Sequence, residues 1–82
     1  MEHSLEAYLS RLSTEILCGV LWGNLSCKES AYSNRDLILM ILRQLEKRCE
    51  ADEELAKGVR KAWDRYTQYM AQIVEEIIGD SR

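Results

Sequence analysis

The chain has 82 residues, of which 46% are hydrophobic and 30% are charged, and its net charge at pH 7 is −3. This hydrophobic content argues against a disordered chain, because buried apolar surface can offset the entropy of folding. The acidic balance gives no overall attraction to nucleic acid or to an anionic membrane. Proline is absent and glycine occurs four times, which favours long helices over a turn-rich β fold.

Two helix starts are visible in the first part of the chain. Ser4 can cap a helix over about residues 4–11, and Ser13 can cap a second helix over about residues 14–22. The apolar pattern also allows one continuous helix across this region. We favour two helices, with the break near residues 10–13.

A polar segment separates these helices from the rest of the chain. Gly23 and Asn24 predict a helix stop, since both residues accept the left-handed conformation that commonly ends a helix. Residues 23–33 are polar and show no apolar periodicity. We therefore expect residues 23–33 to form a loop.

The third predicted helix covers about residues 34–50. Ser33 with Asp36 three residues later resembles a capping box, and Asn34 is a competing cap. Six consecutive apolar residues, 37–42, would cover nearly the whole circumference of a helix, so we expect this segment to be the most buried. A buried β-strand is the alternative for such a run, but the strong helix formers that follow it favour a helix.

The last predicted helix, over about residues 53–78, is the most informative feature of the chain. Asp52 is its expected cap and Gly79 its expected end. At about 1.5 Å per residue it would span roughly 39 Å, so it either braces the whole domain or offers part of its surface to a partner. Gly58 lies inside it and either allows close helix contact or is a tolerated surface glycine. Apolar residues alternate at steps of three and four along one side: Leu55, Val59, Ala62, Trp63, Tyr66, Met70, Ile73, Val74 and Ile77.

These elements together predict an all-α fold. We expect one helical domain over residues 1–82, built as a small three- to four-helix bundle with a long C-terminal amphipathic helix. The short link between the last two helices predicts that they form an antiparallel hairpin. The N-terminal helices would cover the remaining face.

No set of residues predicts catalysis, a cofactor or a metal. His3 is the only histidine, and the three cysteines lack the closely spaced pairs of a tetrahedral zinc site. Cys18 and Cys49 are expected to pack as small hydrophobic residues, and Cys27 to be exposed. The start of the chain lacks the pattern of a signal peptide, and the longest apolar run is too short to cross a bilayer. We expect a cytoplasmic, non-enzymatic protein with free thiols.

Two groups of residues on the long helix are candidate interaction sites. A basic strip on its polar side is the only feature that suggests nucleic acid; a solvated helix face is the simpler interpretation, and an acidic protein surface is a third. The strip consists of Lys57, Arg60, Lys61 and Arg65. Arg43, Lys47 and Arg48 would extend it if the hairpin brought them close.

The second group is the end of the apolar stripe, four large aliphatic residues with an aromatic residue before them. If the rest of the bundle is too short to cover them, they form an exposed patch suited to a partner. We expect these residues to be the partner interface: Tyr69, Ile73, Val74, Ile77 and Ile78.

Parts of the first fifty residues resemble a group of bacterial proteins. The segments that carry the resemblance are residues 3–9, 12–15, 36–42 and 45–48. They look like short helical proteins, themselves uncharacterised, that are carried on mobile elements of Gram-positive gut bacteria. The resemblance implies a bacterial cytosolic origin and no particular activity.

The leading functional hypothesis is therefore a non-enzymatic helical module that acts through protein–protein contacts. The amphipathic C-terminal helix would lay its apolar stripe against another helix. If that helix belongs to a second copy of the chain, the product is a homodimer. The alternative is a small nucleic-acid-associated regulator that uses the basic strip. Neither hypothesis includes a membrane or a small-molecule substrate.

Overall fold

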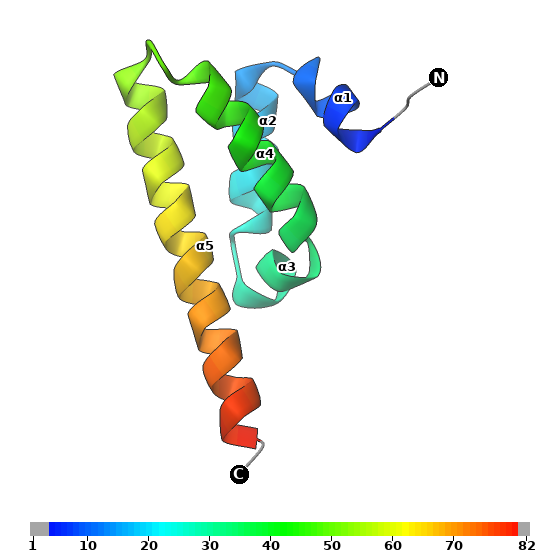
Figure 1. The fold of residues 1–82 in the computed structure, drawn as a ribbon, viewed down its shortest axis with the longest axis vertical. Helices are drawn as coiled ribbons and strands as arrows, with labels where there is room; N and C mark the ends of the chain where they lie inside the picture. The colour runs from blue at the N-terminus through cyan, green and yellow to red at the C-terminus, as the bar shows by residue number, and fades with distance from the viewer. Residues whose placement is uncertain (1–3, 81–82) are drawn as a thin grey trace.

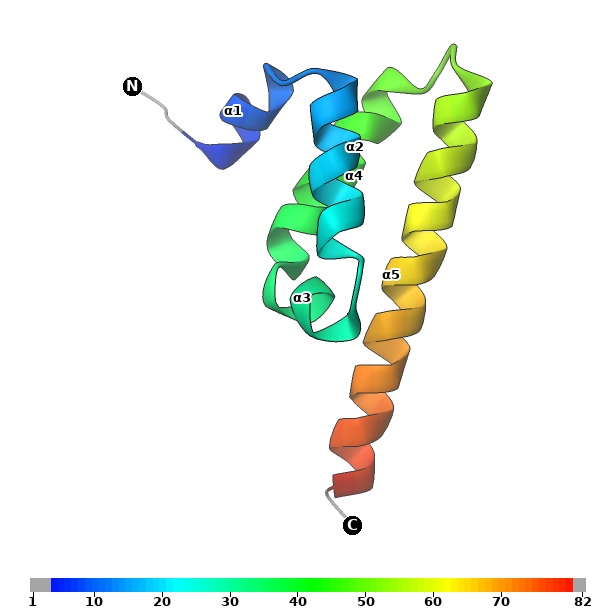
Figure 2. The same ribbon diagram turned by 180° about the vertical axis from the view of Figure 1, so that it is seen from behind.

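The computed structural model describes residues 4–80, and the secondary structure within this range is entirely α-helical. The prediction of an all-α fold with a long C-terminal helix is confirmed. Figures 1 and 2 show α5 running along one side of a group formed by the other helices. The five helices are α1 (Leu5–Ser10), α2 (Thr14–Asn24), α3 (Lys28–Ser33), α4 (Arg35–Arg48) and α5 (Glu53–Asp80).

Side-chain caps start the two N-terminal helices. The backbone N–H of Ala7 donates to Ser4 Oγ at 3.1 Å, and that of Ile16 donates to Ser13 Oγ at 3.2 Å. Each bond satisfies a backbone donor that the first turn of a helix leaves without an internal partner. The expected break between two helices in this part of the chain is confirmed.

The prediction of a loop over residues 23–33 was wrong, because this segment contains the short helix α3. The helix buries a single side chain, Ala31, and therefore leaves no apolar periodicity in the sequence. Its position is fixed by Ser30, whose hydroxyl donates to the Asn24 carbonyl oxygen at 2.8 Å. The bundle consequently has five helices within the described residues, rather than three or four.

Two expected helix boundaries also differ in detail. Gly23 lies inside α2, which continues through Asn24, and no residue among 4–80 has a positive φ angle. The capping box at Ser33 does not form, since Ser33 is the last residue of α3. Asn34 lies at the N-cap position of α4 without a side-chain capping bond, and its amide donates instead to Asn24 Oδ1 at 2.7 Å.

The central helix α4 is the most buried element, as its apolar run predicted. It packs against α1, α2, α3 and α5. Contact on several sides explains how a helix of 14 residues can bury five side chains, namely Ile38, Ile41, Leu42, Gln44 and Leu45. The rest of the core comes from all the other helices and from Leu25: Leu9, Leu17, Leu21, Leu25, Ala31, Val59, Ala62 and Tyr66.

The long helix α5 begins at a cap and lies beside α4. The backbone N–H of Leu55 donates to Asp52 Oδ1 at 3.1 Å, which confirms the predicted start. Trp63 Nε1 donates to Glu46 Oε2 at 2.8 Å and joins α5 to α4. Gly79 was expected to end the helix, but α5 continues through Asp80, the last residue described.

Helix length explains the shape of the molecule. The 28 residues of α5 correspond to about 42 Å, whereas the 14 residues of α4 correspond to about 21 Å. The longest dimension of the molecule, 45 Å, is close to the length of α5 alone. The C-terminal end of α5 consequently extends past α3, and none of the other helices described in residues 4–80 lies beside it (Figures 1 and 2). Within residues 4–80 we find no helix with the length and apolar character needed to cross a membrane.

Candidate interaction surface

The five residues of the expected partner interface divide into two groups. Val74, Ile77 and Ile78 are exposed, with 52%, 57% and 50% of their surface accessible. Tyr69 and Ile73 are half-buried, and Tyr69 packs against the core. The exposed residues lie at spacings of three and four and therefore share one side of the helix. We call Val74, Ile77 and Ile78 the tail patch.

The helix α3 determines where the covered part of α5 ends. Lys28, the first residue of α3, forms an ion pair with Glu76 of α5. The hydrogen bond to the Glu76 carboxylate raises the pKa of the Lys28 ammonium group. A shallow hollow of about 270 Å³ lies between the two helices and is lined in part by Tyr32 and Ile73. Ile73 is therefore covered on one side by its own chain, and the tail patch is the part of the expected interface that remains on the surface.

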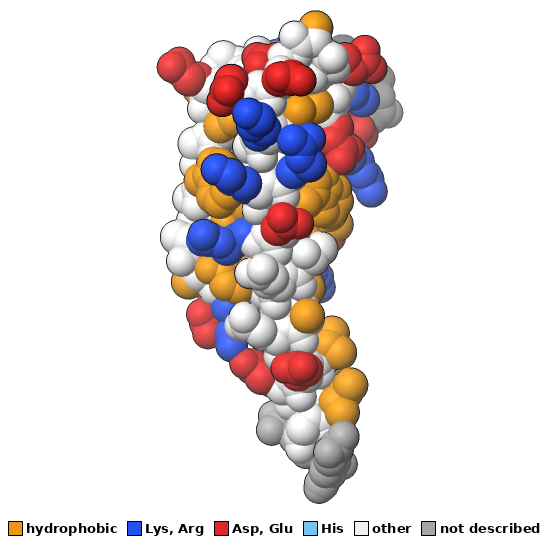
Figure 3. Space-filling model, turned by 90° about the vertical axis from the view of Figure 1, so that its left-hand side faces the viewer, with side chains coloured by type: hydrophobic (Ala, Val, Ile, Leu, Met, Phe, Trp, Pro, Cys, Tyr) orange, Lys and Arg blue, Asp and Glu red, His pale blue; other side chains and the backbone are white. Residues whose placement is uncertain are grey.

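The basic strip lies on the outer side of the first half of α5. Lys57, Arg60 and Lys61 line a second shallow hollow, of about 350 Å³, together with Trp63 and Asp64. Figure 3 shows basic side chains gathered over the upper half of this side and hydrophobic ones along its lower end. The hollow therefore offers positive charge beside an aromatic ring, with one carboxylate among the basic groups.

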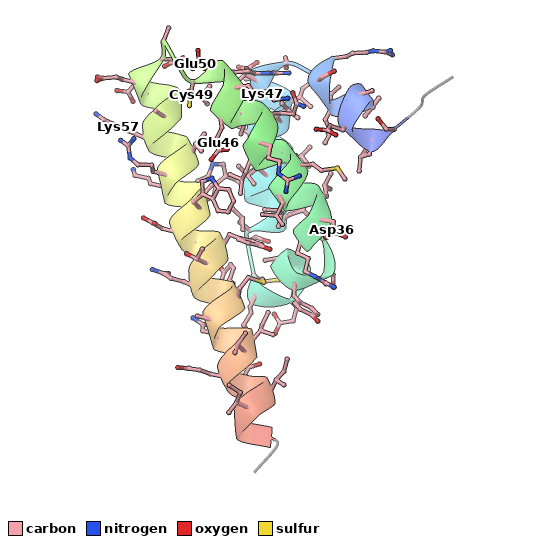
Figure 4. The ribbon with its side chains drawn as sticks, viewed as in Figure 1. Asp36, Glu46, Lys47, Cys49, Glu50 and Lys57 are labelled. Atoms are coloured by element: carbon pink, nitrogen blue, oxygen red, sulfur yellow. The ribbon has the colours of Figure 1, made fainter. Side chains whose placement is uncertain are left out.

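The remaining basic residues do not join this hollow. The Arg65 guanidinium carbon lies 5.8 Å from the centre of the Trp22 ring, a cation–π distance. Arg48 donates from Nη1 to Thr14 Oγ1 and from Nη2 to the Ser10 carbonyl oxygen, both at 3.1 Å, and so joins α4 to the start of α2. Figure 4 shows Lys57 on the outer side of α5 and Lys47 on the far side of α4, with Glu46 between the helices. Three residues of the predicted strip thus line the hollow, and the fourth, Arg65, lies beside Trp22.

The middle and the C-terminal part of α5 also differ in charge. Residues 57–65 carry four basic side chains and one acidic side chain, whereas residues 66–80 carry three acidic side chains and no basic one. Acidic groups near a C-terminus oppose the helix dipole, so they do not stabilise an isolated helix. Glu53 and Glu54 in the first turn of α5 suit the dipole, whereas the acidic residues at its C-terminal end are not explained by helix stability.

Sequence reasoning missed a second exposed apolar face, on α2. Ile16 is 51% exposed and Val20 is 36% exposed, and the two are four residues apart. Gly19 and Gly23 lie beside them and are also exposed, and a Cβ atom added to either would meet nothing within 4 Å. The spacing of Ile16 and Val20 in the sequence was the available signal.

The three cysteines are free thiols; Cys18 packs against the core and Cys27 is exposed, as predicted. Cys18 and Cys49 are half-buried, and Cys27 is exposed. Burial raises the pKa of the Cys18 thiol, whereas hydrogen bonding with the Ser30 hydroxyl, 3.5 Å away, lowers that of Cys27. Residues 4–80 contain no cluster of three histidine, cysteine or acidic residues able to hold a metal ion. His3 lies outside the described residues.

The geometry of α5 therefore contains two neighbouring surfaces, an exposed apolar patch at its end and a basic hollow beside its first half. Neither places a nucleophile, a base and an orienting group together, as covalent catalysis would require. Comparison with protein-family models, curated proteins and solved structures gives no match for this chain. The resemblance of the first fifty residues to mobile-element proteins thus stays an expectation.

Proposed function

We propose that this protein is a non-enzymatic helical interaction module that self-associates through the C-terminal end of α5. The observation that carries the proposal is the position of the tail patch, three large aliphatic side chains on a helix end that extends beyond the rest of the fold. Single exposed apolar residues are common on protein surfaces, but contiguous ones mark interaction sites. The three free cysteines fit a reducing compartment, and we place the protein in the cytoplasm.

The mode of contact follows from helix geometry. A straight, exposed apolar side of a helix is best covered by a second helix, whose side chains fit between those of the first. A second copy of the chain supplies such a helix, because in a symmetric dimer the same surface of each copy covers that of the other. Val74 and Ile78 make the best test positions, since both are at least half exposed and their replacement leaves the core intact.

The test is light scattering coupled to size-exclusion chromatography over a concentration series under reducing conditions. We expect the mass to rise from 9.5 kDa towards twice that value. The double variant Val74→Asp/Ile78→Asp should stay at the monomer mass with an unchanged helical circular-dichroism spectrum. The matched control is Ile16→Asp/Val20→Asp, which places the same charges on the exposed face of α2.

Each result has a defined meaning. A monomer at every concentration contradicts self-association. Dimerisation that survives in the α5 variant but is lost in the α2 variant would move the interface to α2. Loss of helical signal in the α5 variant would assign Val74 and Ile78 to the core and contradict the proposal as well.

A second candidate function is nucleic-acid binding by the basic hollow. The observation that favours it is the position of Lys57, Arg60 and Lys61 around Trp63, since basic groups contact phosphates and aromatic rings stack on bases. Binding should weaken steeply as salt rises, because association releases counterions. Labelled DNA and RNA whose mobility is unchanged at low salt would contradict this candidate.

A further inference from the structure

We propose that the second copy binds with its α5 antiparallel to the first, so that the tail patch of each copy enters the basic hollow of the other. This inference rests on the proposed function and specifies its geometry. It is carried by a row of exposed residues on the outer side of α5, distinct from the apolar stripe that faces the core. We call this row the outer seam. It consists of Arg60, Asp64, Thr67, Ala71, Val74 and Ile78, all exposed.

The spacing of the outer seam is that of a coiled coil. Its members follow one another at steps of four, three, four, three and four residues. The five steps average 3.6 residues, close to the 3.5 of a coiled coil, and keep one line of side chains towards a partner helix. Val59, Ala62 and Tyr66 face the core and are buried, so they do not belong to this row. The helix α5 therefore carries two stripes, one that faces the core along the first half of the helix and one that is open to a partner.

The charges on the outer seam select the antiparallel arrangement. Parallel helices in register would place Arg60 opposite the partner's Arg60 and Asp64 opposite the partner's Asp64. Like charges in direct contact repel, so this arrangement is disfavoured. Antiparallel helices centred near residue 69 place Arg60 opposite the partner's Ile78. The aliphatic part of the arginine can then cover the isoleucine while the guanidinium remains in water.

The middle of the seam suits close contact between helices. In the same arrangement Thr67 lies opposite the partner's Ala71, and both side chains are small. The Thr67 hydroxyl donates to the Trp63 carbonyl oxygen at 3.0 Å within its own helix, so it needs no partner across the interface. The crossing point thus contains no large group that would hold the helices apart.

One side of the seam carries residues of opposite charge that an antiparallel pair of helices brings together. Residues that follow a seam position by one lie on the same side, and antiparallel helices bring these sides together. Lys61 follows Arg60, and Glu75 follows Val74. Lys61 lies two residues, or about 3 Å along the helix, from the position directly opposite the partner's Glu75. The lysine side chain is long enough to reach the glutamate across this distance. A symmetric dimer contains this pair twice.

The opposite side of the seam is apolar. Trp63 and Met70 lie there and are half-buried within their own chain. Trp63 also lines the hollow that would receive the partner's tail patch. The acidic C-terminal end of α5 then lies along the basic segment 57–65 of the partner helix. This contact accounts for acidic residues at a helix end where the helix dipole disfavours them. A single pair of helices buries less than the roughly 1,600 Å² of a typical stable complex, so the association should be reversible.

The decisive experiment reverses charges at Lys61 and Glu75. Within one chain these residues are fourteen positions apart on one helix, about 21 Å, so they interact only between copies. Lys61→Glu and Glu75→Lys should each raise the dimer Kd by about tenfold, since two attractive pairs become repulsive. The double variant Lys61→Glu/Glu75→Lys should restore Kd to within about threefold of the original value. Both measurements use sedimentation equilibrium of the full chain.

Disulfide trapping provides a second readout that does not depend on charge. In a Cys18→Ala/Cys27→Ser/Cys49→Ala background, Thr67→Cys and Ala71→Cys variants are mixed under a mild oxidant. We expect the mixed disulfide between the two variants to form fastest. Preferential Thr67→Cys self-linkage would show parallel helices and overturn the proposal.

The outcomes separate this inference from the proposed function. Failure of the unmodified chain to associate contradicts both. Association that requires Val74 and Ile78 but is not restored by the double charge reversal leaves the interaction module standing and overturns the antiparallel arrangement. If the basic hollow instead binds labelled DNA, with binding lost in Lys61→Glu and not recovered in the double variant, the hollow is a nucleic-acid surface and the inference is wrong.

Discussion

The two halves of α5 have similar apolar patterns and different surroundings. In the first half, Val59, Ala62 and Tyr66 are buried, whereas no side chain of residues 67–79 is buried. The difference arises from the length of the neighbours, because α4 and α3 end before α5 does (Figure 1). Apolar periodicity therefore identifies the side of a helix that can be buried against other helices. The lengths of the other helices decide how much of that side is covered.

The halves also differ in what replacement of a residue should do. A change at a buried position of the first half acts on the folding free energy, since its side chain contacts other helices. A change at an exposed apolar position of the second half acts on association, since its side chain faces solvent. Three pairs of like residues, with one member in each half of α5, permit matched tests of this division: Ala62 and Ala71, Val59 and Val74, and Gly58 and Gly79.

The largest effect is expected from a charge in place of a buried alanine. Ala62 has 0% exposed surface, so Ala62→Asp places a carboxylate without a partner in the core. This should cost about 4 kcal/mol or more, a large part of the 5–15 kcal/mol that stabilises a typical domain. Urea denaturation followed by circular dichroism at low concentration measures the change.

The matched variant is Ala71→Asp in the exposed half. Its monomer stability should stay within about 0.5 kcal/mol of the original. The same variant should abolish self-association, because Ala71 belongs to the outer seam. Equal destabilisation by the two substitutions would contradict the division of α5 into a folding half and an association half.

Local signals accounted for much of the fold. Ser4, Ser13 and Asp52 are caps in the sequence and in the structure, because a cap depends on a hydrogen bond within three residues. The apolar run of α4 identified the most buried helix, because a helix that is apolar on all sides needs contact on several sides. The helix α3 was missed because Ala31 is its single buried residue.

The candidate surfaces were harder to predict, since they depend on distant packing. The sequence placed Ile73 with Val74, but only the position of α3 separates the covered residue from the exposed one. Arg65 has the spacing of the basic strip, but Trp22 of α2 lies beneath its guanidinium. Thr67 and Ala71 carry no strong apolar signal, so the outer seam becomes visible only when the core-facing side of α5 is known.

A smaller effect is expected from shortening the two valines. Val59→Ala removes two buried methyl groups and should cost about 2 kcal/mol, from lost burial and the cavity that remains. Val74→Ala should cost less than about 0.5 kcal/mol in the monomer, since its side chain is half exposed. Thermal unfolding at low protein concentration compares them, and similar losses in both variants would show that the tail patch is packed in the monomer.

A gain in stability is expected from the glycines. A Cβ atom added at Gly58 would meet nothing within 4 Å, so Gly58 makes no close helix contact. Gly58→Ala should stabilise the fold by about 0.5–1 kcal/mol through the higher helix propensity of alanine. Gly79→Ala should change stability much less, because terminal turns fray. An unchanged melting temperature for Gly58→Ala would contradict this expectation and would show that helix propensity at residue 58 does not limit the stability of the fold.

The smallest effect concerns the boundary between the halves, where Lys28 pairs with Glu76. Exposed ion pairs contribute little to global stability, so Glu76→Gln should leave the melting temperature nearly unchanged. It should nevertheless speed hydrogen exchange at residues 73–80, because the pair holds α3 against this part of α5. Exchange at residues 55–66 should not change.

The pH dependence of this effect has a definite sign. Glu76 raises the pKa of Lys28 in the folded chain, so the contribution of the pair is present below the ordinary lysine pKa and is lost as pH rises through the raised value. Glu75→Gln is the control, since it removes the same charge one residue away, outside this ion pair. Exchange is measured at a concentration where the chain is monomeric, so that contacts between copies do not contribute. Faster exchange in Glu75→Gln than in Glu76→Gln would show that total charge, rather than the contact with α3, limits the opening of the second half of α5.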